Sequence, residues 1–215
     1  MLQESIIVNH YKNSRRYILY KNNDRESSNY KNNSKTETLP QLMAKDGGEE
    51  LLLQYQNYRD KIFDLSDFNE AFELVKSTVE SKFKMHRAGL SLILQGLPTI
   101  LGAYHIMGSN LIIVNKRILN IIKKYKSQEE YNSYLFMILA HEYLHSLGVI
   151  DELQVRKMTY DLISSLVGED HIAARMARYQ PWDLFPELRY FQNNSFEQKF
   201  EIIKNFDNTN QSYIG

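Results

Sequence analysis

Cysteine is absent from the 215-residue sequence, and this absence narrows the chemistry open to the chain. Without cysteine there is neither a disulfide framework nor a thiolate metal site, so a bound metal must be held by histidine, aspartate or glutamate. The absence is also typical of a reducing compartment, and no basic-then-apolar targeting pattern stands near Met1. We therefore expect a cytoplasmic protein.

Long apolar runs and an excess of one charge are also missing. No stretch approaches the ~18 apolar residues that a membrane span requires. Lysine plus arginine and aspartate plus glutamate both total 26, so no net positive charge attracts nucleic acid or an anionic membrane. We expect neither as a partner. The 43% hydrophobic and 24% charged residues are typical of a globular domain.

Composition divides the chain into three parts. Residues 1–38 are polar, and Lys21 to Lys35 contain no aliphatic side chain, so we expect disorder there. A flexible tail is favoured over an inhibitory pro-segment for this part. Residues 39–192 carry the apolar periodicities of a folded domain, and residues 193–215 form a polar C-terminal tail with one expected helix, Phe196–Ile203.

Within residues 39–192 the patterns predict an α+β domain with a small mixed sheet. Its central apolar strand should lie inside the sheet, because both of its faces are apolar. The expected elements are helices over Glu49–Tyr58 and Asp67–Arg87, strands at Leu90–Leu94, Ile100–Ile106 and Leu111–Val114, and helices over Gln128–Leu147, Asp151–Leu166 and His171–Tyr179. The apolar segment between Pro181 and Pro186 is expected to be lid-like.

The helix over Gln128–Leu147 contains the most informative motif, HEYLH, at residues 141–145. A capping box at Ser127 and Glu130 starts this helix, and Gly148 is suited to end it. His141 and His145 are four residues apart and share one helix face, so both can bind one Zn²⁺. Two satisfied core histidines are the structural alternative, but two histidines and a glutamate are costly in an apolar helix unless something compensates them.

Zinc hydrolysis requires three protein ligands and a position open to water. Glu142 is the candidate general base, which takes a proton from the metal-bound water. Gly148 allows a sharp turn, so Asp151 is our first candidate for the third ligand. Glu152 and His171 remain alternatives. The structural alternative for Asp151 is that it caps the N-terminus of the helix that follows it.

Further candidates for oxyanion or supporting roles are weaker, and core or surface positions are the favoured interpretation for each. These candidates are Tyr160, Arg156, Tyr179 and His171, with Met158 and Met176 as an apolar floor or core filler.

The segment His141–Asp151, read as HExxHxxGxxD, resembles the zincin metallopeptidases, as a metzincin-like variant with Asp151 at the third position. The helix and strands that precede this segment in the sequence also resemble those of the zincins. The resemblance implies a zincin-like fold, a substrate peptide lying along an edge strand, His141, His145 and Asp151 as ligands of one Zn²⁺, and Glu142 as base.

We therefore expect a zinc metallopeptidase that acts on peptides or proteins. The alternatives are a non-catalytic zincin-like binding or regulatory protein with structural zinc, and a metal-independent helical interaction protein. The intact Glu142 favours the enzyme, because a purely structural site has no need of a base.

Overall fold

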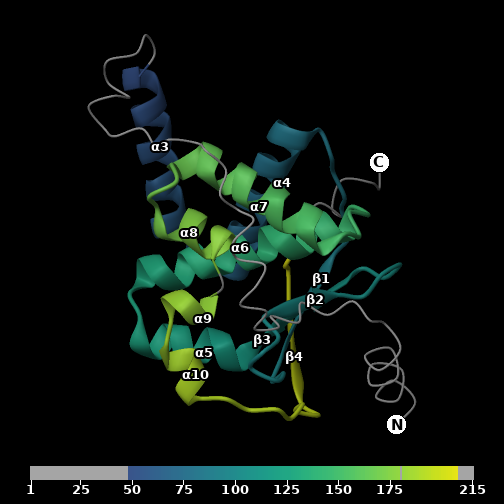
Figure 1. The fold of residues 1–215 in the computed structure, drawn as a ribbon. Coiled ribbons are helices and arrows are strands. Elements are labelled where there is room, and N and C mark those ends of the chain that lie inside the picture. The colour runs from purple at the N-terminus through teal and green to yellow at the C-terminus, as the bar shows by residue number, and fades with distance from the viewer. Residues whose placement is uncertain (1–47, 180, 208–215) are drawn as a thin grey trace.

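The computed structural model describes residues 48–179 and 181–207 (Figure 1). The segment 1–38, for which we expect disorder, lies outside these residues. The described part confirms the α+β class, with many helices and one small mixed sheet. Among its helices none combines the length and apolarity that crossing a bilayer demands.

The sheet has the strand order β2-β3-β1-β4. Its strands are β1 (Ser91–Gln95), β2 (Ala103–His105), β3 (Leu111–Asn115) and β4 (Phe200–Ile203). β1 and β3 are parallel, whereas β2 and β4 run antiparallel to their neighbours. The interior position that the sequence predicts for the apolar strand Leu111–Val114 is confirmed by β3, which lies between β2 and β1.

Both faces of β3 are covered, and this explains its unbroken apolar run. Successive side chains of a strand point to opposite faces of the sheet. Ile112 and Val114 belong to the main core with the helices, whereas Ile113 packs with Leu97 and Leu101 in a second cluster.

The predicted helix at Phe196–Ile203 is wrong, because β4 occupies the end of that segment. Two β-branched residues and a free edge on β1 favour a strand there. The carboxylate of Asp207 anchors the chain beyond β4: Oδ1 lies 2.7 Å from Nζ of the buried Lys76, and Oδ2 accepts a hydrogen bond from the backbone N of Leu90. The polar tail is therefore part of the folded domain as far as residue 207.

Helix α6 (Gln128–Ser146) runs through the middle of the helical part of the molecule. The predicted capping box is present, since Glu130 N donates to Ser127 Oγ at 3.2 Å and Ser127 N donates to Glu130 Oε2 at 2.9 Å. Every residue of 132–144 is buried, as expected for a helix that is apolar nearly all round. Figure 1 shows α4 and α7 on one side of α6, and α5 and α9 on the other.

The helices around α6 largely match the sequence patterns. They are α3 (Gly48–Phe63), α4 (Phe68–Phe83), α5 (Lys116–Tyr125), α7 (Glu152–Val167), α8 (Ile172–Arg178), α9 (Pro181–Leu184) and α10 (Glu187–Tyr190). The sequence pattern does not predict α5, which begins directly after β3 with Asn115 as its N-cap. The segment that was expected to be lid-like instead places Phe185 in the core.

Arg87 fixes the C-terminal end of α6 against the sheet. Its guanidinium donates to the carbonyl of Ser146 at 2.6 Å and to the carbonyl of Ser109, in the β2–β3 turn, at 2.7 Å. The buried Tyr143 hydroxyl accepts from Arg87 N at 2.8 Å and donates to Arg87 O at 3.0 Å. These bonds hold the motif helix beside the edge strand β2.

Candidate metal centre

His141 and His145 lie one turn apart on α6, and their ring centroids are 5.0 Å apart. The helix ends directly after them. Val149 N donates to Leu144 O at 3.3 Å, and Gly148 adopts φ +93°, which is strained for any residue with a side chain. This turn reverses the chain and brings the start of α7 back towards the two imidazoles.

Glu152, the first residue of α7, completes a group of three potential metal ligands. Its Oε2 atom lies 3.2 Å from Nε2 of His145 and 3.5 Å from Nε2 of His141. All three ligand atoms lie within 4.8 Å of one another. Two zinc ligands at 2.0–2.1 Å in tetrahedral geometry stand about 3.3 Å apart, so both distances to Oε2 fit one shared cation.

The structure does not bring Asp151, the first candidate for the third ligand, to this group. Asp151 is exposed and is the N-cap of α7, where its Oδ1 accepts a hydrogen bond from Gln154 N at 2.8 Å. Its carboxylate is thus engaged with the backbone, as N-caps are. Glu152, which the sequence left as an alternative, takes its place in the candidate triad.

The surroundings orient the ligands. Nδ1 of His145 lies 2.8 Å from the carbonyl of Val149 and donates to it, which leaves Nε2 free to bind a metal. Nε2 of His141 is buried and makes no hydrogen bond within the described chain, as expected of a donor atom that awaits a ligand. The side chain of His141 is 6% exposed and that of Glu152 37%, so the group opens to solvent on the α7 side.

The carboxylate and the imidazoles shift each other's titration. Burial favours the neutral form of Glu152, but the close contacts and charges of the two histidines outweigh it and lower its pKa to about 2. Burial likewise opposes protonation of His145, yet Glu152 and Glu142 raise its pKa above the usual value. An extra positive charge is therefore favoured at this point, whether a proton or a metal ion supplies it.

Glu142 lies beside the group with its side chain wholly inside the protein. It is 0% exposed, and neither carboxylate oxygen has a hydrogen-bond partner among the described residues. Burial raises its pKa, while the neighbouring histidines and, weakly, the backbone N–H of His105 on β2 lower it. An unpartnered buried carboxylate is costly, and it is a suitable proton acceptor for a water at the group.

The remaining candidates lie at different distances from the group. His171 is the N-cap of α8 and its Nδ1 accepts from Ala173 N at 3.2 Å, so it is not part of the triad. Tyr160 lies under the Arg178 guanidinium. Arg156 and Tyr179 line a small hollow beside His141, and the buried Met176 lines it as well.

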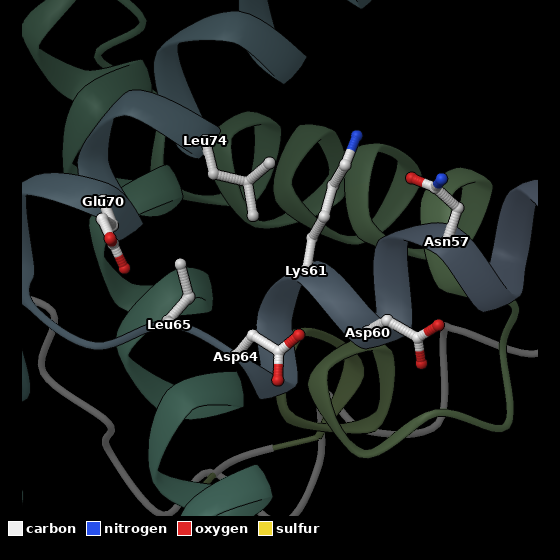
Figure 2. Close-up of a pocket in the computed structure, with 7 residues that line it drawn as sticks. All are labelled: Asn57, Asp60, Lys61, Asp64, Leu65, Glu70 and Leu74. Atoms are coloured by element: carbon white, nitrogen blue, oxygen red, sulfur yellow. The ribbon is translucent and has the colours of Figure 1, made fainter.

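A larger hollow lies between α3 and α4, away from the triad (Figure 2). Figure 2 shows Asp60 projecting from α3, Asp64 from the turn directly after it, and Glu70 from α4. All three carboxylates are exposed, and Glu70 already accepts hydrogen bonds from the backbone and hydroxyl of Ser66. This hollow has the character of an ordinary solvated surface.

Comparison with known proteins adds no relative: no protein-family model, curated protein or solved structure matches the chain. The functional argument therefore depends on the geometry of the residues themselves.

We predict that Glu152→Gln lowers the affinity for Zn²⁺ by about a hundredfold or more, whereas Asp151→Asn, which retains a capping side chain, changes it by less than about tenfold. Chelator competition with the purified proteins measures both affinities. The reverse order would place the third ligand at Asp151 and contradict the triad described here.

A second prediction concerns acid stability. Burial, with a smaller effect of the Arg59 charge, lowers the pKa of His171 to about 4. Between pH 6.5 and 4 the unfolded chain binds a proton that folded His171 does not, so the folded state loses stability as the pH falls. At pH 5 this loss is about 2 kcal/mol relative to pH 7.

The variant His171→Asn keeps a capping side chain but cannot titrate in this range. Urea unfolding in the presence of a chelator should therefore show a smaller loss of stability between pH 7 and pH 5 for the variant than for the wild type. Equal losses in the two proteins would show that His171 does not titrate as described.

Proposed function

We propose that this protein is a zinc-dependent metallopeptidase with a zincin-like fold, in which His141, His145 and Glu152 hold one Zn²⁺ and Glu142 is the general base. The observation that carries the proposal is the convergence of three donor atoms beside a buried carboxylate that has no partner among the described residues. Imidazole and carboxylate are the ligands that a catalytic zinc site prefers, and three of them leave a position open.

A zinc ion at this group would supply a Lewis acid and lower the pKa of water from 15.7 to about 7. The protein supplies the proton transfers. Glu142 takes a proton from the attacking water and later passes it to the nitrogen of the leaving amine, so that one residue serves as base and then as acid.

The sheet offers a place for the substrate. β2 packs against α6 and pairs with β3 along one edge, and no strand of the described residues pairs with its other edge. An extended peptide can add to such an edge as a further strand. His105 at the end of β2 lies close to Glu142, which would bring the scissile bond next to the base.

Glu142 also distinguishes the enzyme from a protein with structural zinc. A structural site has no use for a buried carboxylate without a hydrogen bond, and its burial costs stability. A residue that weakens the fold and touches the reacting group is characteristic of an active site.

The test is the variant Glu142→Gln, which preserves the shape of the side chain. We expect it to bind zinc as the wild type does, to lose peptide cleavage by about 10²- to 10⁴-fold, and to be more stable than the wild type without metal. Glu129→Gln, an exposed position on the same helix, is the control and should leave cleavage unchanged.

Metal analysis, a fluorogenic peptide assay and thermal unfolding give the three readouts. Unchanged cleavage by Glu142→Gln would refute its role as base. A zinc-binding protein whose wild type cleaves no peptide in a broad library would favour the structural-zinc alternative.

A further inference from the structure

Arg87, in the loop between α4 and β1, contacts both the motif helix and the turn that follows the edge strand. Its backbone is fixed to α6 by the buried Tyr143, whose hydroxyl accepts from Arg87 N and donates to Arg87 O. Its side chain bridges two segments: Nη1 donates to the carbonyl of Ser146 at 2.6 Å, and Nη2 donates to the carbonyl of Ser109 at 2.7 Å. One rigid, planar group therefore sets the separation of these two carbonyls.

The α6 end of this bridge lies next to the candidate metal ligands. Ser146 is the last residue of α6 and directly follows His145. The carbonyls of a last helical turn lack partners within the helix, so the guanidinium of Arg87 caps this end and complements its partial negative charge. The three ligands are brought together separately, by the turn at Gly148.

The other end of the bridge lies at the edge strand. Ser109 closes the turn that follows β2, where its Oγ donates to Ile106 O at 2.7 Å and accepts from Leu111 N at 3.1 Å. β2 itself ends at His105, whose backbone N–H is close to the carboxylate of Glu142. A shift of Ser109 relative to α6 would therefore also move the end of β2 relative to the base.

We propose that Arg87 is a positioning residue, which sets the distance between the zinc ligands on α6 and a substrate peptide on the edge of β2. The inference rests on the proposed function and deepens it, because it names the substrates that depend on the bridge: peptides long enough to lie along β2 in extended form. A ligand that contacts the metal alone does not depend on it. Displacement of a reacting group by about 1 Å can lower a rate a hundredfold, so the length of the bridge matters for cleavage.

The bridge requires arginine in particular. The two carbonyls accept from separate nitrogens of one group whose geometry is fixed. The ammonium of a lysine is a single point on a flexible stem, so it would attract both carbonyls without fixing their separation. Arg87→Lys should therefore retain part of the effect of Arg87 on a bound peptide, and Arg87→Met should retain none.

Two metal-binding compounds of different length test the proposal on the zinc-loaded full chain. Acetohydroxamate can bind the metal but is too short to lie along β2, whereas a tripeptide hydroxamate can do both. Calorimetry on the wild type first selects the tightest binder from a library of tripeptide hydroxamates. Arg87→Met should weaken binding of this compound about tenfold or more, and should leave the affinities for acetohydroxamate and Zn²⁺ within about threefold of the wild type.

Arg59→Met is the matched control. Arg59 is half-buried as well, and its guanidinium donates to the carbonyl of Val167 at the end of α7 and pairs with Asp170. Its loss removes the same kind of helix cap, but on α3, away from β2 (Figure 1). Arg59→Met should therefore keep the full preference for the tripeptide compound, and Arg87→Lys should show an intermediate preference.

The outcomes separate this inference from the proposed function. If neither compound binds the wild type in zinc, the metal centre is overturned and the positioning role with it. The positioning role alone is overturned if the wild type binds both compounds equally, if Arg87→Met weakens both by the same factor, or if it keeps the full preference. An equal loss of preference in Arg59→Met would also overturn it, because the effect would then be one of general stability.

Peptide cleavage gives a second, independent readout. The kcat/KM of the wild type should rise with the length of the peptide, as more of the substrate pairs with β2, and Arg87→Met should flatten this dependence. A fall in kcat/KM by the same factor for short and long peptides would show that Arg87 acts on the metal or the base. That result would contradict the positioning role and leave the peptidase proposal standing.

Discussion

The contact of the Glu152 carboxylate with the imidazoles of His141 and His145 joins the two helices on which the candidate site is built. It depends on the turn at Gly148, whose positive φ lets α7 return to the face of α6 that carries the histidines. Without that turn the histidines would be two buried bases on an apolar helix, which is a costly arrangement. With it, a single anionic oxygen lies within 3.5 Å of both Nε2 atoms.

Around this contact the fold leaves several polar groups without the partners that folding alone would provide. Nε2 of His141 and both oxygens of Glu142 have no hydrogen-bond partner within the described residues. Elsewhere buried charges are matched, as Lys76 is by Asp207. These two groups are adjacent in sequence on α6, and their chemistry is complementary to a metal ion and a water.

Much of the architecture followed from local physical rules. The capping box at Ser127 and Glu130, and the glycine after α6, are short-range features that depend on a few neighbouring residues, and the structure confirms them. The β4 strand could not be predicted in this way. Its pairing with β1 joins residues about a hundred positions apart, and this long-range contact overrides a weak helical pattern.

The site shows the same division between local and tertiary information. The spacing in HEYLH predicts the two histidines and the base, because the helix period alone sets their relation. The choice between Asp151 and Glu152 depends on which of them caps α7, and this is decided by the direction in which the chain leaves Gly148. His105 and Arg156 come close to the candidate site only when β2 and α7 pack against α6, so no local sequence pattern predicts their positions.

X-ray absorption at the zinc edge of the metal-loaded protein tests the central claim most directly. The account predicts one zinc per chain, bound by two imidazole nitrogens and light oxygen ligands, with one oxygen lost from the spectrum of Glu152→Ala. A spectrum with three imidazoles, or one that Glu152→Ala leaves unchanged, would contradict it.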